Sequence, residues 1–318
     1  MAKWVIKKGC WTRSAKIYAI WSVCAVIFYC FFQIALRNSS SHKDSSSRAD
    51  SGSSMAYAEQ RSILYSKMAK DLDEKGAAFL KQGETSQSLS LSDLFTLKDG
   101  IVTPVLRPAD PPVRANVLYL STEYSVPISE AVKNVFSPYF DKSIWFQNSS
   151  MYHFSMFHAS HHKTPVPVTE TEIEAEANAV EGVAATICPL NIVLDRVILT
   201  STGVLLGCWQ VASGNDPVTI RAKLKAALPR APQNQLYDEA MLHTSFARLL
   251  GHPKKFPKDE NKSELQIFHD LVSKLNSQIQ GTKATVSELW YVEELDLLAL
   301  ALDGRMKTRK FQLACSLA

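Results

Sequence analysis

Two short stretches of the sequence place a serine two positions after a histidine. In a β-strand, residues two apart project from the same face, so each histidine would share a face with its serine. Imidazole can take or give a proton near neutral pH, and a hydroxyl can donate a hydrogen bond to a phosphate oxygen. Two such pairs facing one cleft would form a metal-free acid–base site for a phosphate. The stretches are Tyr152-His153-Phe154-Ser155-Met156-Phe157 and Leu242-His243-Thr244-Ser245-Phe246-Ala247.

The charge of the chain is unevenly distributed. The 318 residues carry a net charge of +4, and a hydrophobic content of 46% is enough for a substantial core. Residues 1–37 hold six basic side chains and no acidic one, which leaves 29 basic against 31 acidic residues elsewhere. A nearly neutral body lacks the basic surface typical of proteins that bind long nucleic acids. We therefore expect a small substrate or a chain end, and the sequence leaves the oligomeric state open.

An uncharged run near the N-terminus predicts a membrane anchor. Ile17 to Leu36 is 20 residues long, and about 20 residues at ~1.5 Å each span the ~30 Å hydrocarbon core of a bilayer. A cleaved signal peptide and a buried helix are the alternatives, but the run is long and no clear cleavage site follows it. Five basic residues precede it in the predicted cytosolic tail, residues 1–16. We expect a single-pass type II protein of the Golgi or endoplasmic reticulum, with its C-terminal domain in the lumen.

The region after the anchor divides into a linker, a stalk and a compact domain. In the predicted flexible linker, residues 37–55, 9 of the 17 residues from Asn38 to Ser54 are serine. Residues 56–112 predict a stalk helix, or a helix packed on the body, followed by a hairpin that turns at residues 99–100. The compact domain is expected over residues 113–318. Three glycosylation sequons fit a lumenal placement, at Asn38, Asn148 and Asn261.

Within residues 113–318, strand and helix patterns mix without regular alternation. This mixture predicts an α+β fold with mainly antiparallel sheets. Each histidine motif has a helix and further strands around it. The pattern therefore indicates two pseudo-symmetric lobes that flank a central cleft.

The same region resembles the two-histidine (2H) phosphoesterase superfamily, which includes RNA ligase-like cyclic nucleotide phosphodiesterases. The family pattern is two copies of histidine, an apolar residue, threonine or serine, and another apolar residue, on strands of two lobes. The motif at His153 matches every position, whereas in the motif at His243 the polar Thr244 stands where an apolar residue is usual. The separation of 90 residues and the order of elements also fit. An arginine often follows the second motif in this family, and Arg248 occupies that place.

The resemblance implies a metal-independent phosphoesterase that hydrolyses 2',3'-cyclic phosphates or 2',5'-linked nucleotide-like substrates without a cofactor. His153 and His243 would be the catalytic acid and base, in an order that the sequence leaves open. Ser155 and Ser245 would bind the phosphate, and Arg248 would add positive charge. Strict alternation, however, puts Arg248 on the strand face opposite His243, so it reaches the cleft only if the strand bends or ends. The alternative is a catalytically inactive protein of this fold that binds a phosphate ligand or a protein partner in the secretory pathway.

A second cluster of histidines raises the alternative of a metal site. Its acidic neighbours are distant in the sequence, and the pair His161-His162 runs into Lys163-Thr164-Pro165, which favours a solvated loop for that pair. We therefore expect no metal. The cluster consists of His158, His161 and His162.

Two further patterns limit the chemistry. None of the six cysteines forms a CxxC pair, and Cys188, Cys208 and Cys315 allow at most one disulfide among themselves. A Golgi glycosyltransferase would share the anchored topology and usually shows an Asp-x-Asp pair. The pair Asp71 and Asp73 falls in the predicted stalk, where we expect it to have no such role.

Overall fold

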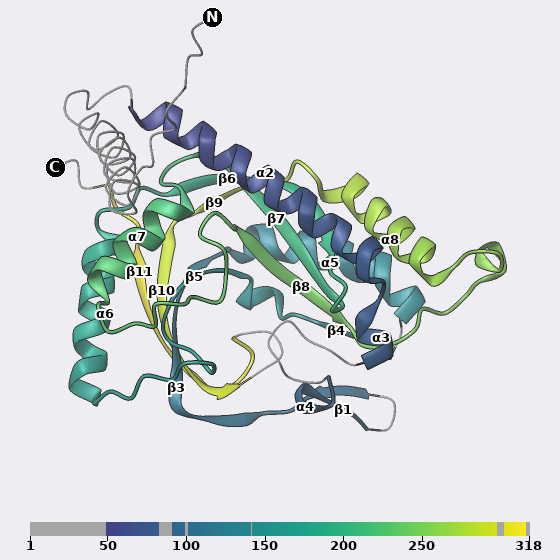
Figure 1. Cartoon of the computed structure of the whole chain (residues 1–318), viewed down its shortest axis with the longest axis horizontal. Coiled ribbons are helices and arrows are strands. Elements are labelled where there is room, and N and C mark those ends of the chain that lie inside the picture. The colour runs from purple at the N-terminus through teal and green to yellow at the C-terminus, as the bar shows by residue number, and fades with distance from the viewer. Residues whose placement is uncertain (1–48, 83–90, 99–100, 141, 298–301, 316–318) are drawn as a thin grey trace, which may run out of the picture. The chain divides into compact units, whose positions relative to one another are not determined.

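The computed structural model describes residues 49–82, 91–98, 101–140, 142–297 and 302–315. The predicted cytosolic tail, the anchor Ile17–Leu36 and the sequon at Asn38 lie outside these ranges. None of the helices in the described part of the chain is both long and apolar enough to cross a membrane. The described residues form helices and antiparallel sheets, which confirms the α+β class (Figure 1).

Two larger sheets each contain one of the histidine motifs. The four-stranded sheet has the order β11-β10-β3-β5, and the five-stranded sheet has the order β4-β8-β7-β6-β9. Every strand pair in both sheets is antiparallel, as expected. The first sheet comprises β3 (Arg107–Tyr119), β5 (His153–Ser160), β10 (Glu288–Leu297) and β11 (Met306–Gln312). The second comprises β4 (Ile144–Phe146), β6 (Leu190–Leu199), β7 (Val204–Ser213), β8 (His243–Leu249) and β9 (Lys283–Val286).

Helices pack on both sheets and bury a shared hydrophobic core. α6 contacts β10 and β11, and α7 contacts β5. α5 contacts β4 and β8, and α8 contacts β6. Phe154 and Phe246, which alternate with the motif residues, are fully buried in this core, so the motif side chains project from the other sides of their strands. The helices are α5 (Thr122–Phe140), α6 (Glu170–Ala184), α7 (Pro217–Ala227) and α8 (Glu264–Ile279), with 3-10 turns at Ser149–Met151 and Pro257–Asp259.

The predicted stalk is a helix packed on the body. α2 (Ala49–Lys75) begins inside the predicted linker, so residues 49–55 are helical. Serine disfavours a helix only weakly, and packing of the later turns stabilises the whole element. Arg61 forms a fully buried ion pair of 2.6 Å with Asp216, the N-cap of α7. The hydroxyl of Tyr65 accepts a hydrogen bond of 3.1 Å from the Leu242 amide, so α2 holds the start of β8 in place.

Two short helices and a hairpin connect α2 to the first sheet: α3 (Ala78–Gln82), α4 (Leu91–Leu94), β1 (Phe95–Lys98) and β2 (Ile101–Pro104). β1 and β2 pair as the sequence predicts, and the predicted turn between them lies outside the described residues. β3 begins at Arg107, ahead of the predicted boundary at residue 113. Its pairing with β10 is interrupted between Pro108 and Val113, and prolines are tolerated where a strand needs no amide donor.

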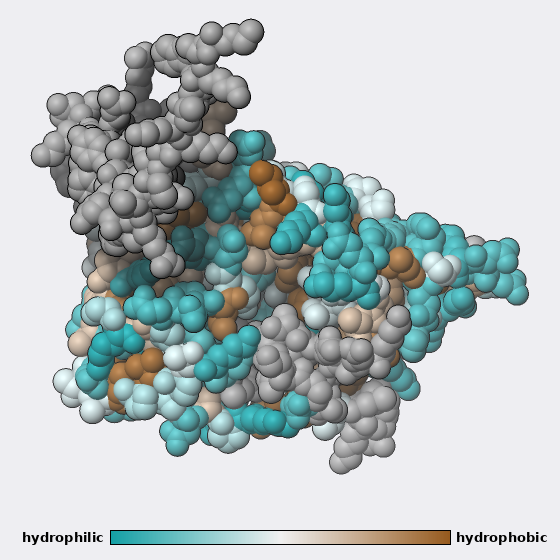
Figure 2. All heavy atoms as spheres, in the orientation of Figure 1, coloured by the Kyte–Doolittle hydropathy of each residue, from teal (hydrophilic) through white to brown (hydrophobic). Residues whose placement is uncertain are grey.

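Cys188 and Cys315 form a disulfide, whereas Cys208 is a buried free thiol. This agrees with the expectation of at most one bridge among the three, and it links the segment between α6 and β6 to the end of β11. The sequon residues Asn148 and Asn261 are both exposed. Figure 2 shows a mainly hydrophilic face on which hydrophobic side chains lie in separate small areas.

Candidate active site

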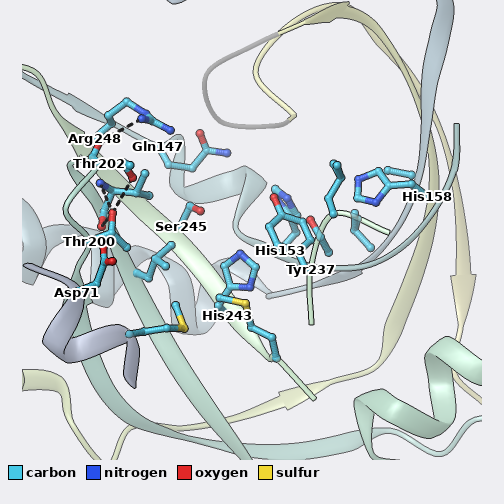
Figure 3. A pocket seen from close by; sticks show the side chains of 18 of the residues that line it. Asp71, Gln147, His153, His158, Thr200, Thr202, Tyr237, His243, Ser245 and Arg248 are labelled. Atoms are coloured by element: carbon cyan, nitrogen blue, oxygen red, sulfur yellow. Dashed lines mark hydrogen bonds between the residues drawn. The ribbon is translucent and has the colours of Figure 1, made fainter. Parts of the chain in front are cut away.

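A single cavity of about 560 Å³ brings together residues from both histidine motifs. His153 and Ser155 come from β5, whereas His243 and Ser245 come from β8 of the other sheet. Arg248 also lines the cavity. Figure 3 shows Arg248 and His158 at opposite ends, with His153 and His243 between them. All five of the residues that the sequence selected as catalytic or substrate-binding therefore meet in one pocket.

A β-bulge turns Arg248 toward the pocket. On β7, the alternate residues Cys208, Leu206 and Val204 pair with His243, Ser245 and Arg248 of β8. The pairing slips by one residue between Leu205 and Leu206, so Phe246 is the extra residue of β8. A bulge of this kind reverses the alternation beyond it. Arg248 therefore shares a face with His243, and the expectation from strict alternation is wrong.

β5 contains a matching bulge. Val117 pairs with Ser155 and the neighbouring Asn116 pairs with Phe157, which leaves Met156 as the extra residue. His158 pairs with Ala115 and thereby shares a face with Ser155. Both strands thus present side chains at positions i, i+2 and i+5. His158 is the counterpart of Arg248.

A backbone carbonyl fixes the orientation of His153. Nδ1 of its ring lies 2.8 Å from the Met151 carbonyl oxygen, which can only accept a hydrogen bond. The proton of the neutral ring must then reside on Nδ1, so Nε2 carries the lone pair. This tautomer suits a general base. Burial lowers the pKa of His153, against a smaller raising effect of that hydrogen bond.

His243 is held by packing rather than by a carbonyl. Its side chain is 7% exposed, and the ring of Tyr237 contacts it edge-on with centroids 4.8 Å apart. Nδ1 is buried and has no hydrogen-bond partner among the described residues. Burial, and then the nearby charges of Arg221 and His153, lower the pKa of His243 to about 3.

The end of the pocket that contains Arg248 can bind an anion. Arg248 is 2% exposed, and its Nη1 donates to the Thr202 carbonyl oxygen at 3.4 Å. Burial lowers the pKa of Arg248 to about 10, which still leaves the guanidinium charged at neutral pH. Ser155 and Ser245 also line the cavity. Together they provide neutral and charged donors for phosphate oxygens.

A buried arginine that the sequence analysis missed connects the two motif strands. Arg221 of α7 donates hydrogen bonds to the carbonyl oxygens of Ser155 at 3.0 Å and of Met156, the extra residue of the β5 bulge, at 2.9 Å. It also donates to the Met241 carbonyl oxygen at 2.7 Å, two residues before His243. One rigid guanidinium therefore sets the separation between the two motifs.

The acidic pair in α2 does not act as a unit. Asp71 lines the pocket, contrary to the expectation for a stalk residue, and accepts hydrogen bonds from the Ser201 hydroxyl and from Lys75. Asp73 instead pairs with His269 at 2.7 Å. The two carboxylates thus have separate partners and do not form a shared metal-binding pair.

In the part of the chain that the structure describes, the histidine cluster at the end of β5 is not arranged around a metal ion. Both ring nitrogens of His161 are occupied: Nε2 lies 3.0 Å from the Asn234 carbonyl oxygen, and Nδ1 accepts from the Thr164 amide at 3.2 Å. Across the described residues, no group of three or more His, Cys, Asp or Glu side chains is arranged to hold a metal ion. His158 is the member of the cluster that lies on β5.

Several solved structures are similar to this chain. The crystal structure of TT0787 of Thermus thermophilus is 13% identical, with 64% of this chain and 99% of that chain covered and a TM-score of 0.44. Escherichia coli LigT complexed with ATP is 11% identical, with 64% and 98% covered and a TM-score of 0.36. A phosphoesterase is 13% identical, with 64% and 99% covered and a TM-score of 0.37. The chain matches no protein-family model and no curated protein. Identity at this level leaves the chemistry of the pocket to be judged from its own residues.

Proposed function

We propose that this chain is a metal-independent phosphodiesterase that hydrolyses cyclic or 2',5'-linked nucleotide-like phosphodiesters with two histidines. One observation supports this most: two His-x-Ser pairs from different sheets line one cavity. Each pair supplies a group that moves protons and a group that binds phosphate oxygens. In-line hydrolysis requires one proton to be removed from water and another to be delivered to the leaving oxygen.

The tautomer of His153 assigns the role of base to this residue, which leaves the role of acid to His243. Nε2 of His153, with its lone pair, takes the proton of the attacking water as its oxygen bonds to phosphorus. The bond between phosphorus and the leaving ribose oxygen breaks, and protonated His243 gives its Nε2 proton to that oxygen. Ser155, Ser245 and Arg248 donate to the non-bridging oxygens, where negative charge develops. The product is a phosphomonoester, and proton exchange with solvent restores both rings.

Substrate binding must protonate His243 for this to occur. Its pKa of about 3 keeps the ring neutral in the free pocket at neutral pH. A bound phosphodiester brings a negative charge into contact with the ring, which favours the imidazolium. Binding therefore takes up a proton, and the substrate generates its own general acid.

The direct test is turnover of nucleoside 2',3'-cyclic phosphates by the purified chain in the presence of EDTA. Phosphomonoester formation is expected to proceed at an unchanged rate after chelation, since no step requires a metal ion. Loss of turnover on chelation, restored by a divalent ion, would contradict the metal-independent mechanism. Binding of inorganic phosphate without turnover of any phosphodiester would instead support an inactive phosphate-binding protein.

We also propose a type II membrane topology with the body in the lumen of the secretory pathway. The uncharged run Ile17–Leu36 and its basic flank support the anchor. The disulfide between Cys188 and Cys315 supports an oxidising compartment, since such bonds are rare in the cytosol. Protease protection of the body in sealed microsomes tests this placement, and digestion without detergent would contradict it.

A further inference from the structure

The pocket extends beyond the groups needed for one phosphate. Its volume of about 560 Å³ lies in the range of roughly 300–1,000 Å³ that is typical of sites for whole small molecules. The two histidine motifs and Arg248 account for its phosphate-binding part. The rest of its wall on the first sheet includes two buried polar side chains that the proposed reaction does not use, His158 and Glu294.

His158 and Glu294 project from the same face of the first sheet. Glu294 of β10 pairs with Val113 of β3, and His158 of β5 pairs with Ala115, two residues further along β3. Neighbouring strands lie about 4.8 Å apart and successive residues about 3.3 Å apart along a strand, so the two backbone positions lie roughly 12 Å apart across the sheet. Ala115 and Val113 form a flat apolar floor between them. A planar ring fits this floor, with polar groups at two of its edges.

Within the described part of the chain, Glu294 has fewer partners than a buried carboxylate normally needs. It is 8% exposed. Among the described residues it accepts one hydrogen bond, which the Leu302 amide donates to Oε2 at 3.1 Å. No lysine, arginine or histidine in the described ranges forms an ion pair with it. Burial raises the pKa of Glu294 to about 7, so its carboxylate is poised to be stabilised by a ligand. A ligand that donates hydrogen bonds to Oε1 would favour the ionised form.

His158 is in a similar situation at the other edge. It is 7% exposed, and its backbone is fixed by Gln235, which accepts from the His158 amide at 2.7 Å and donates to its carbonyl at 3.1 Å. The ring contacts the rings of His161 and Tyr237. Burial, and then the neighbouring His161, lower the pKa of His158 to about 3. A neutral imidazole at this place offers one donor and one acceptor to a heterocycle.

We propose that His158 and Glu294 form a base-recognition subsite that binds a nucleobase with an exocyclic amino group. Carboxylates read such amino groups as hydrogen-bond acceptors, and a base can lie flat on Ala115 and Val113. This inference rests on the proposed function, because the phosphate of the same nucleotide would lie between His153 and His243. It assigns to Glu294 the preference for adenine, cytosine or guanine over uracil.

The test compares turnover of adenosine, cytidine, guanosine and uridine 2',3'-cyclic phosphates with that of bis(4-nitrophenyl) phosphate, which has no base. We express kcat/KM for the preferred amino-bearing substrate as a ratio to kcat/KM for the base-free diester. Glu294→Gln is expected to lower this ratio by about tenfold or more, because one good base contact is lost. The ratio of kcat/KM for the preferred amino-bearing substrate to that for uridine 2',3'-cyclic phosphate should fall by a similar factor. The matched control is Glu130→Gln on the exposed surface of α5, which should leave both ratios as in the wild type.

Calorimetry with free nucleosides separates this inference from the proposed function. If no phosphodiester is turned over, the proposed function fails, yet binding of an amino-bearing nucleoside that weakens about tenfold in Glu294→Gln still supports the subsite. Unchanged ratios in Glu294→Gln, in an enzyme that does turn over phosphodiesters, would overturn the subsite and leave the function standing. Nucleoside binding that is absent, or equal in wild type and variant, would likewise overturn it.

Discussion

Replacing either His153 or His243 with asparagine is expected to lower kcat by about 10²–10⁴-fold, the usual contribution of a positioned general acid or base. Asparagine retains a polar side chain but cannot transfer a proton at neutral pH. Both rings line the pocket, so neither substitution removes a contact inside the main hydrophobic core. Turnover of a nucleoside 2',3'-cyclic phosphate, measured beside circular dichroism and the melting temperature, checks the effect.

His252→Asn is the matched control for these variants. His252 is 67% exposed on its side chain and pairs with Glu264 on the surface, at 2.7 Å. An exposed pair of this kind contributes little, about 0–1 kcal/mol. Its replacement should leave kcat at the wild-type value. Wild-type turnover in both pocket variants would contradict the assignment of His153 and His243 as the acid–base pair.

The second large effect is expected at Arg221. Replacement by lysine keeps the charge but leaves one nitrogen in place of three, so several buried carbonyl oxygens lose their donor. Each buried acceptor left without a partner costs about 1–3 kcal/mol, so the free energy of unfolding should fall by several kcal/mol. The same change lets the motif strands move apart, and a displacement of about 1 Å can cost ~10²-fold in rate. Urea unfolding and kcat on the same preparation measure both losses.

A comparison of Arg221→Lys with Arg221→Met tests whether the residue positions the site or only stabilises the fold. The charge of Arg221 lowers the pKa of His243, so the methionine variant should raise that pKa and the lysine variant should not. The pH profile of kcat/KM should then shift upward in the methionine variant alone. Arg230 is exposed and pairs with Glu172, so Arg230→Lys is the control for replacing a guanidinium by an ammonium group outside the pocket. Identical pH profiles in both Arg221 variants would contradict an electrostatic role.

The features that could be predicted from the sequence are those that depend on residues close together in the chain. The His-x-Ser pairs share a strand face because alternation is a property of the strand itself. The hairpin between β6 and β7 turns at Gly203, whose φ of +83° suits glycine. Such features were predictable without knowledge of the strand order.

The positions that sequence reasoning missed, or left conditional as it did for Arg248, depend on pairings between distant segments. Arg248 and His158 face the pocket because of bulges at Phe246 and Met156, which arise from the register with β7 and β3. Asp71 reaches the pocket only because α2 packs on the body. Glu294 lies there because β10 pairs with β3. For His158, Asp71 and Glu294, the local sequence carries no signal for the contact.

The most direct test of the central claim is to measure the pKa values of His153 and His243 by nuclear magnetic resonance, with ¹⁵N-labelled histidine, in the absence and presence of saturating inorganic phosphate. In the free protein both values should lie below the usual ~6.5, with that of His243 near 3. Bound phosphate should shift the resonances of both rings and raise the pKa of His243, so phosphate affinity should increase as pH falls through the raised value. The exposed His252 is the internal reference. Saturating phosphate that leaves both pocket histidines unchanged would contradict the account.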